Sequence, residues 1–423
     1  MRKLKAEIWD KVQYIFRNYY DRMVHAALYF DGVLNLGYLK KSVYRLADEY
    51  PVLKSTFKNN PVRPYWKVNE LTESECVGHV VCDDLQKSVH AALAKEIAVG
   101  AKKQFEIILH ISGNKCALSV IVNHMCLDGG DLKYFLGKLT EAYNLLSSGK
   151  DLSGLEFKHG TRSYTQLYKD MSEEDRKKAK KLYVNVSRTG IKNKFSFTDG
   201  NDCTTRFNLI KFTKEEFSNM RAKAKTAGAT VNDIFLAAYA KCICKYIDGN
   251  DSRLAVTNMK NLRYHMADND SEELTNLTGF MPCVLEMADG SFEEVLKAVC
   301  EVTSKAKEDK FCGLYGLPLM ALAFRLFPFS IAELVIRIGY ENPLIGMSNI
   351  GILTEEMTAY NGAKCTDAFM TGATKYKPYI QLTSTTFDGV PTLCIAQKCN
   401  DEDERRIRAL LNDIKTLLLD YIN

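Results

Sequence analysis

Hydrophobic residues in the first third of the chain follow two different periods. Residues 34–50 place leucine and valine side chains three or four positions apart, and a proline ends this helical pattern. Residues 105–111 and 116–122 instead alternate apolar with other side chains, and a Gly-Asn turn joins them. Apolar side chains between 132 and 139 then return to helical spacing. The pattern predicts a helix, a β-hairpin and another helix, in that order.

The second half of the chain also interleaves strand-like and helix-like segments. Residues 207–212 read FNLIKF and predict a strand, and a helix is expected from Lys214. Thr230 can cap the next helix, which has an apolar face from Val231 onward. Further expected segments are strands at 254–258 and 379–387, a helix at 292–306 and an amphipathic helix at 401–422. Both halves therefore predict an α/β or α+β fold class.

Residues 147–205 differ in composition from the segments on either side. They contain SSGKDLSG, the charge run SEEDRKKAKK and a stretch rich in glycine, asparagine and aspartate. We interpret residues 171–205 as a connection that crosses between an N-terminal unit, residues 1–170, and a C-terminal unit, residues 206–423. A chain of 423 residues suits two such units, because a domain commonly holds about 100–200 residues.

The most apolar stretch of the chain is LPLMALAFRLFPFSIAELVIRIG, residues 317–339. Two arginines, a proline and a glutamate interrupt it, whereas a membrane-spanning helix needs about 20 mostly apolar residues with few charges. We interpret this stretch as a pair of buried helices. Two alternatives remain, namely contact with a membrane interface and a hydrophobic wall for a medium or long acyl chain or a lipid-like acceptor.

Composition narrows the classes of partner and compartment. The formal net charge is +5, and basic residues are scattered among acidic ones, which argues against nucleic-acid binding. Thirteen cysteines form no disulfide-like framework, and the N-terminus lacks the apolar core of a signal peptide. We therefore expect reduced thiols and a cytoplasmic protein, with membrane contact not expected.

The segment NHMCLDGG places His124 and Asp128 where the predicted hairpin ends and the next helix begins. His-x-x-x-Asp alone is a weak signal, because one of the seven histidines, His79, also has an aspartate at the fourth following position. Only the later match is followed by glycines, and strand ends are common places for catalytic groups. His124 is therefore a candidate catalytic residue. The alternative is a hydrogen-bonded structural histidine beside a turn.

The residue types in this segment suit proton transfer. An imidazole with an ordinary pKa of about 6.5 can take a proton from a hydroxyl or an amine near neutral pH. We expect Asp128 to shape the turn by pairing with a basic group rather than to touch a substrate. Gly129 and the glycine after it permit a tight turn and close approach of an acceptor.

The segment resembles the active-site motif of the HxxxDG acyltransferase superfamily. This superfamily includes chloramphenicol acetyltransferase, alcohol acetyltransferases, polyketide-associated acyltransferases, wax-ester synthases and the condensation domains of nonribosomal peptide synthetases. Weaker matches follow in the same order along nearly the whole chain. They are EYPVLKSTF, GATVNDIFLAAYAKCI, TNMKNLR ending at Arg263, GMSNIG at 346–351 and TSTTFDGVPTL.

The resemblance implies two chloramphenicol-acetyltransferase-like lobes with a tunnel between them. His124 would be the general base that activates a small-molecule acceptor, and Arg263 would pair with Asp128. The acyl donor would be a thioester of coenzyme A or of an acyl carrier protein, used as a co-substrate, with no permanently bound cofactor. Candidates for the oxyanion-stabilising or tunnel-lining group are Ser348, Asn349 and Thr385.

Three alternatives bear on function. Condensation domains usually carry two histidines, whereas this chain has Asn123 in the first place, which favours a free-standing acyltransferase over a condensation-type enzyme that joins carrier-bound substrates. A non-catalytic binding module with the same fold is the rival outside enzymes. Cys76, His79 and Cys82 are zinc-type ligands at three-residue steps, but no fourth ligand lies nearby, so we predict no metal site.

Overall fold

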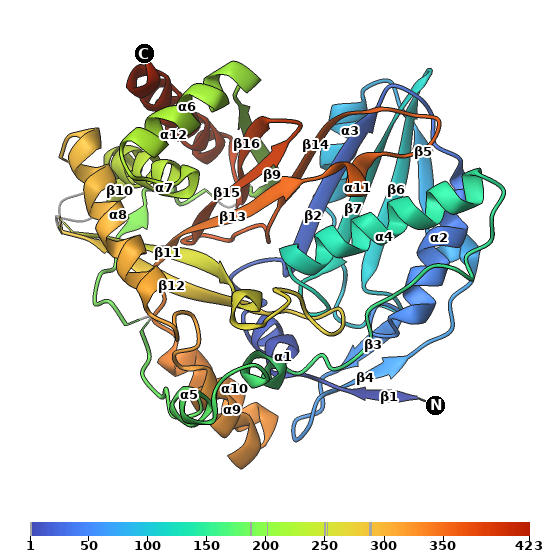
Figure 1. The fold of residues 1–423 in the computed structure, drawn as a ribbon, viewed down its shortest axis with the longest axis horizontal. Helices are drawn as coiled ribbons and strands as arrows, with labels where there is room; N and C mark the ends of the chain where they lie inside the picture. The colour runs from blue at the N-terminus through green and yellow to red at the C-terminus, as the bar shows by residue number, and fades with distance from the viewer. Residues whose placement is uncertain (1, 187, 201, 249–250, 252, 287–289) are drawn as a thin grey trace.

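Two β-sheets, one in each half of the molecule, organise the fold (Figure 1). The computed structural model describes residues 2–186, 188–200, 202–248, 251, 253–286 and 290–423. Helices and strands interleave in both halves, which confirms the predicted fold class.

The first sheet has five strands and helices on both faces. Its strands, in spatial order, are β14 (Cys365–Thr371), β2 (Met23–Phe30), β7 (Lys115–Asn123), β6 (Phe105–Ser112) and β5 (Gly78–Val81). Side chains alternate along β7, so that Leu118 and Val120 pack with helices α2 (Leu36–Glu49) and α4 (Gly129–Ser147). Ile121 points to the other face, where α3 (Leu85–Leu93) packs. The antiparallel pairing of β6 with β7 confirms the predicted hairpin.

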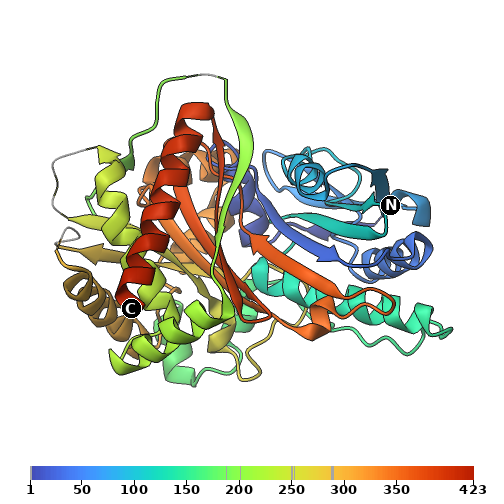
Figure 2. The same cartoon turned by 90° about the horizontal axis from the view of Figure 1, so that it is seen from above.

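The second sheet has six strands and lies beside the first (Figure 2). Its strands, in order, are β12 (Thr278–Leu285), β11 (Leu254–Asn261), β13 (Ile345–Leu353), β15 (Ile380–Phe387), β16 (Val390–Cys399) and β9 (Thr204–Lys211). A second core packs it against α6 (Lys214–Thr226), α7 (Val231–Ile243), α8 (Phe292–Glu308) and α12 (Asp401–Ile422). Thr230 caps α7 as predicted, because its side chain accepts a hydrogen bond from the backbone N–H of Asp233.

The C-terminal half contributes a strand and core residues to the N-terminal half, across the predicted boundary. Strand β14 comes from the C-terminal half, yet it pairs antiparallel with β2 in the first sheet, with Ala368 opposite Leu28. Apolar residues of the C-terminal half, including Leu262, Leu277 and Leu314, also belong to the core of the first half. The predicted division into residues 1–170 and 206–423 therefore does not separate two independent cores.

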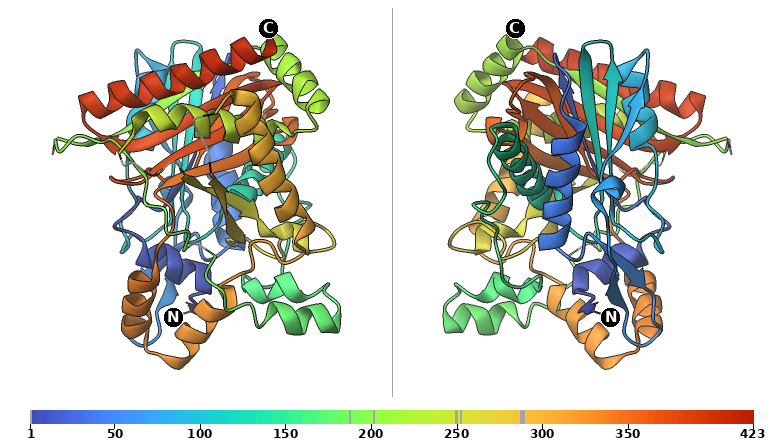
Figure 3. Two further views of the ribbon diagram at one scale, coloured as in Figure 1. Left: turned by 90° about the vertical axis from the view of Figure 1, so that its left-hand side faces the viewer. Right: turned by 90° about the vertical axis from the view of Figure 1, so that its right-hand side faces the viewer.

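Smaller elements complete the described chain, and most of them lie at one end of the molecule (Figure 3). They are β1 (Lys3–Lys5), α1 (Ile8–Ile15), β3 (Ser55–Lys58), β4 (Tyr65–Val68), α5 (Glu173–Ala179), β8 (Lys194–Phe195), β10 (Ile247–Asp248), α9 (Leu317–Leu326), α10 (Phe329–Gly339), α11 (Glu355–Thr358) and four short 3₁₀ turns. Among the described residues, no helix is both long and apolar enough to cross a membrane.

The expectation that residues 317–339 form a buried helix pair is wrong for most of their side chains. Leu317, Phe329 and Ala332 are buried. The exposed large apolar side chains are Leu319, Leu326, Phe327, Ile331, Leu334, Val335 and Ile338. The reason is position: α9 and α10 lie at one end of the molecule, where the described chain covers only their inner faces (Figure 3).

Candidate active site

A cavity of about 670 Å³ has His124 in its wall and is lined by both halves of the chain. The first half contributes α1, β2 and the start of α4, and the second half contributes strands β11, β12, β13 and β15. One side of the cavity consists of α9 and α10, which supply side chains such as Met320, Leu326 and Ile336. A histidine at the junction of two sheets can therefore meet substrates that enter between them.

His124 is the first residue after β7, and backbone pairing fixes its position. Its backbone N–H donates to the carbonyl oxygen of Arg22, at 2.7 Å. Its ring nitrogen Nδ1 lies 3.0 Å from the carbonyl oxygen of Leu127. A carbonyl oxygen only accepts, so this contact requires a proton on Nδ1 and leaves the lone pair on Nε2. That is the tautomer a general base needs.

Asn276 is a buried residue beside His124 that the sequence did not single out. Its Oδ1 accepts from the backbone N–H of Thr278, at 3.1 Å, which fixes the orientation of the amide. Its Nδ2 lies 3.1 Å from the carbonyl oxygen of His124 and 3.0 Å from the ring Nδ1. Because Nδ1 carries its own proton in the tautomer above, the amide donates to the carbonyl oxygen and braces the residue from the second half.

Burial and a neighbouring cation keep the His124 ring neutral. Burial lowers the pKa of His124 most, the charge of Asp128 opposes this, and the positive charge of Lys375 lowers the pKa further. Lys375 lines the same cavity, with its Nζ 4.1 Å from the centroid of the Tyr20 ring. Burial also lowers the pKa of Lys375, to about 8. A neutral imidazole at neutral pH is ready to accept a proton.

Asp128 caps α4 and pairs with Arg263 from the other half of the chain. Its Oδ1 accepts from the backbone N–H groups of Gly130 and Asp131, at 3.0 and 3.1 Å. Its Oδ2 accepts from the backbone N–H of Leu277, at 2.7 Å, and lies 2.9 Å from Nη1 of Arg263. Burial raises the pKa of Asp128, but the charge and hydrogen bonds of Arg263 outweigh it, and the pKa falls to about 2.

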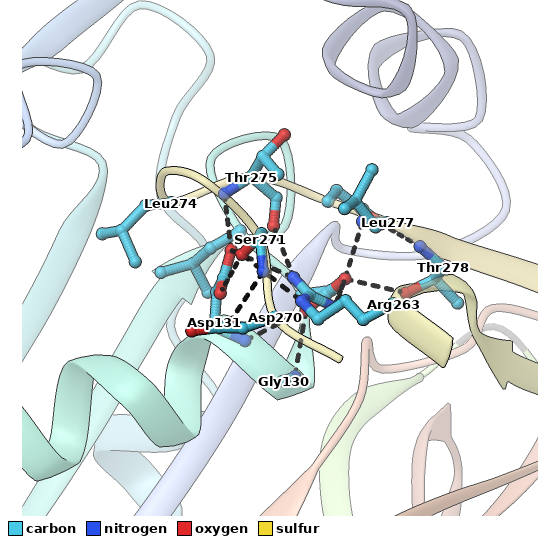
Figure 4. Close-up of polar contacts among 12 residues, drawn as sticks. Gly130, Asp131, Arg263, Asp270, Ser271, Leu274, Thr275, Leu277 and Thr278 are labelled. Carbon is cyan, nitrogen blue, oxygen red and sulfur yellow. Dashed lines mark hydrogen bonds and ion pairs between the residues drawn. The ribbon is translucent and has the colours of Figure 1, made fainter. Parts of the chain in front are cut away.

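Asp131 is a second link between the halves, and no sequence pattern had singled it out. Its Oδ2 lies 3.0 Å from Nη2 of Arg263, and its Oδ1 lies 2.7 Å from Nζ of Lys158. Ser271 and the backbone N–H of Thr275 also donate to its carboxylate, at 2.8 and 2.7 Å (Figure 4). The paired charges tie the start of α4 to the loop before β12, the loop that carries Asn276.

The two motif glycines have different neighbours. A Cβ on Gly130 would lie 3.0 Å from Nη1 of Arg263, so the bare backbone is needed for the buried ion pair. A Cβ on Gly129 would meet Ile350 at 3.5 Å, an ordinary contact. Gly129 lines the cavity, and its missing side chain keeps that part of the wall open.

Of the three oxyanion or tunnel candidates, the structure brings one to the cavity. Ser348 and Ile350 line it, whereas Asn349 between them is exposed on the opposite side of β13, because side chains alternate along a strand. Thr385 is buried, and its hydroxyl donates to the carbonyl oxygen of Met370, at 2.7 Å, where it holds β15 to β14. Asn349 and Thr385 are therefore removed as candidates, and Ser348 is retained.

The remaining singled-out residues lie outside the cavity. Asn123 is buried, and its amide bonds to the Gln104 side chain at 2.8 Å and to the backbone N–H of Met125 at 3.0 Å, so it has a structural role. His79 is exposed on the edge strand β5 and does not line the cavity. Within the described ranges, no group of three or more His, Cys, Asp or Glu side chains could hold a metal ion.

Comparison with known proteins bears on this arrangement. The family model of the condensation domain matches residues 14–319. A search of the curated proteins gave no match. Polyketide synthase associated protein 5 from Mycobacterium tuberculosis is similar in structure, with a TM-score of 0.70 at 13% identity over 100% of this chain and 99% of that one.

Two further solved structures share the fold. The first condensation domain of the calcium-dependent antibiotic synthetase, bound to a substrate analogue, has a TM-score of 0.70 at 13% identity, over 100% of this chain and 97% of that one. Trichothecene 15-O-acetyltransferase from Fusarium sporotrichioides has a TM-score of 0.70 at 12% identity, over 99% of this chain and 95% of that one. At such low identity the likeness establishes the two-lobed fold.

Proposed function

Because this chain belongs to the condensation-domain family, we propose that it is an acyltransferase with His124 as its general base. The acyl group would move from a thioester of coenzyme A or of an acyl carrier protein to a hydroxyl or amine acceptor. The observation that carries this proposal is the His124 ring itself, which lines the cavity with its Nδ1 proton engaged by Leu127 and its pKa lowered.

The reaction follows from that tautomer. Nε2 takes the proton of the acceptor hydroxyl or amine while the acceptor oxygen or nitrogen attacks the thioester carbonyl carbon. The carbon–sulfur bond then breaks, and the imidazolium returns the proton to the departing thiolate. Negative charge on the carbonyl oxygen needs a fixed donor, for which Ser348 is our candidate because its side chain lines the same cavity.

The Lys375 charge supports this role of His124. A cation beside the imidazole disfavours its protonated form, which keeps the base free near neutral pH. The same cation would oppose proton uptake during the reaction, so its benefit is largest where the resting imidazole would otherwise be partly protonated. Lys375 would then set the pH range of the reaction without touching the acyl group.

The proposal is tested by release of free thiol. Purified protein is incubated with acyl-CoA donors from acetyl to palmitoyl and a panel of alcohols and amines, and the same panel is repeated with acyl groups on an acyl carrier protein. We expect thiol release that requires an acceptor, with an ester or amide product identified by mass spectrometry. If no donor and acceptor pair gives product, the protein is a binding module rather than a transferase.

The donor series also tests the hydrophobic wall formed by α9 and α10. Burial of each CH₂ group contributes about 0.8 kcal/mol, so a donor that reaches this wall should gain steeply with chain length. We expect kcat/KM to rise from acetyl toward longer donors. A series that is flat, or that falls from acetyl onward, would remove the wall as an acyl-chain site.

A further inference from the structure

Helix α10 is amphipathic, and an apolar face of it points toward solvent. Ile331, Leu334, Val335 and Ile338 follow the i, i+3, i+4, i+7 spacing of a single helix face and are 46%, 59%, 47% and 72% exposed. A helix at the surface of a globular protein normally turns this face to the core. Phe329, Ala332 and Ile336 already pack α10 against the core. The four large aliphatic side chains therefore form a second apolar face, which stands in water.

An ion pair also holds α10 against the rest of the molecule. Glu333 is mostly buried and lies 2.8 Å from Nη1 of Arg17 and 3.9 Å from Nε of Arg337. The pair with Arg17, which lies outside α10, fixes the rotation of the helix about its own axis, because turning the helix over would separate Glu333 from Arg17. The outward apolar face is thus built into the fold, and large apolar side chains that are exposed next to one another are a mark of an interaction site.

A basic groove of about 760 Å³ borders this face. Its lining includes the exposed apolar side chains Val62, Leu326 and Phe327. Its basic residues are Lys5, Lys11, Arg63, Lys180 and Arg325. Glu7 is the one carboxylate among the described lining residues, and it lies 3.3 Å from Nζ of Lys5.

Exposed apolar side chains and a groove with five basic residues and one carboxylate therefore adjoin one another. Helices α9 and α10 form the lower end of the molecule in Figures 1 and 3. We propose that α9, α10 and the basic groove form a docking surface for an anionic phospholipid membrane, with the apolar stripe in the acyl-chain region and the cations at the headgroups. A helix with large aliphatic residues on one face and basic residues nearby is the usual form of an interfacial anchor.

The composition of this surface favours an anionic lipid bilayer. The stripe residues Ile331, Leu334, Val335 and Ile338 are all aliphatic, and the adjoining groove holds five basic residues and one carboxylate, which matches apolar acyl chains beneath negatively charged headgroups. A second copy of this chain is disfavoured, because a two-fold contact would bring the same cations together from both copies.

The docking surface continues into the catalytic cavity. Leu326 and Phe327 line both the basic groove and the cavity around His124, and Val335 of the stripe lines the cavity as well. A lipid-dissolved substrate could pass from the bilayer to the cavity along apolar side chains. This last step rests on the proposed function, whereas docking itself can be measured without any turnover.

The test is flotation of the full-length protein with vesicles. The vesicles are pure phosphatidylcholine or phosphatidylcholine with phosphatidylglycerol. We expect flotation with the anionic vesicles, weaker flotation with the neutral ones, and loss of the difference at high salt. Leu334→Ser combined with Ile338→Ser should reduce the bound fraction at least tenfold. These residues do not line the cavity, so thiol release from a water-soluble donor should be unchanged.

Matched control variants test whether any exposed apolar or basic residue of the surface has the same effect on vesicle binding. Val81 is 75% exposed on β5, away from α9 and α10, and Val81→Ser should leave flotation unchanged. Arg63→Gln with Arg325→Gln should lower binding to anionic vesicles alone. Arg405→Gln, on the exposed side of α12, should have no effect. Equal losses in the controls and in the surface variants would contradict the proposal.

Two other results would overturn it. If the wild type floats with neither vesicle, the surface does not dock on membranes, whatever the outcome of the thiol assay. If the wild type is a dimer in solution, or binds an acyl carrier protein, and the Leu334 and Ile338 double variant abolishes that association without any vesicle binding, a protein covers the stripe instead. Inactive protein that still floats would refute the proposed function and leave docking intact.

Discussion

Two segments of this molecule share the same sequence spacing, and in each of them a strand is followed by a helix. His124 follows β7 and its partner Asp128 caps α4, whereas His79 lies within β5 and the cap of α3 is Asp84, the residue after Asp83. Both helices begin with an aspartate cap, since Asp128 accepts from Gly130 and Asp131, and Asp84 accepts from the backbone N–H of Lys87 at 2.9 Å.

The surroundings of the two segments differ. Strand β7 is interior, paired with β2 and β6, whereas β5 is an edge strand paired with β6. His124 lines a cavity and Asp128 meets a buried arginine, whereas His79 and Asp83 are exposed. The spacing of a motif therefore describes only a short stretch of chain. Whether its histidine can act as a base depends on the residues and the cavity that the rest of the fold places around it.

The largest expected difference is in turnover. His124→Ala should lower kcat about 10²- to 10⁴-fold, because the proton acceptor is lost, while His79→Ala should leave kcat unchanged. Steady-state thiol release on both variants, with melting curves as the folding control, measures this. Equal losses in the two variants would mean that the surroundings do not distinguish the two histidines.

The second-largest expected effect is the loss of stability when the buried Asp128–Arg263 ion pair is broken. Asp128→Asn keeps a good helix cap but removes the charge that faces Arg263. Losing one partner of a buried pair costs about 3–5 kcal/mol, and we expect the lower end because Asp131 still pairs with Arg263. Asp84→Asn also keeps its cap and should change the free energy of unfolding little. Urea unfolding of both variants compares them, and equal costs would refute a special role for Arg263.

The contribution of Asp128 to the free energy of unfolding also depends on pH. Its pKa in the folded protein is lowered to about 2 from the ordinary 3.8, so the folded state holds this proton less tightly than the unfolded chain. Its contribution is complete above pH 3.8 and is lost as the pH falls toward 2. Wild type and Asp128→Asn should therefore converge in stability over that range, and a constant difference would contradict the assignment.

A smaller difference is expected between two glycines. Gly130→Ala should cost about 1–3 kcal/mol, because the new Cβ would lie 3.0 Å from Nη1 of Arg263. Gly78→Ala, in β5, places its Cβ 3.7 Å from Ile108 and should be tolerated. Unfolding midpoints of the two variants in urea measure this, and an unaffected Gly130→Ala would show that Arg263 can shift freely.

The smallest expected effect is a shift in the pH profile. Because the His124 pKa is lowered, kcat/KM should stay high as the pH falls through 6.5 and decline below it. Lys375→Met removes a cation that lowers this pKa, so the decline should begin at a higher pH. If Lys375→Met has the same pH profile as the wild type, Lys375 does not act on His124. His79→Ala is the control and should leave the profile unchanged.

Local features of the fold were predictable from the sequence, whereas distant pairings were not. The β6–β7 hairpin and the Thr230 cap depend on residues near one another in the chain, and both are confirmed. Strand β14 pairs with β2 across more than three hundred residues, and no local pattern indicates such a partner. Asn276 and Lys375 are also distant from His124 in the sequence, and only the fold brings them to the same cavity.

The expected burial of residues 317–339 was wrong for another reason than sequence distance. Apolar composition alone suggested burial, but composition does not report which face of a helix meets the core. The spacing of Ile331, Leu334, Val335 and Ile338 defines a face, and Glu333 and Arg337 lie on another. The structure shows that Phe329 and Ala332 face the core and that Glu333 is paired with Arg17, which leaves the four aliphatic side chains outside.

The proposed reaction depends on a neutral His124 at neutral pH, with its proton on Nδ1 and its lone pair on Nε2. Nitrogen-15 NMR of protein labelled at histidine measures this directly, and comparison with the His124→Ala spectrum assigns the ring signals. We predict one protonated-type signal at Nδ1 and one unprotonated-type signal at Nε2 at pH 7. Two protonated-type signals, or the reverse tautomer, would contradict the account.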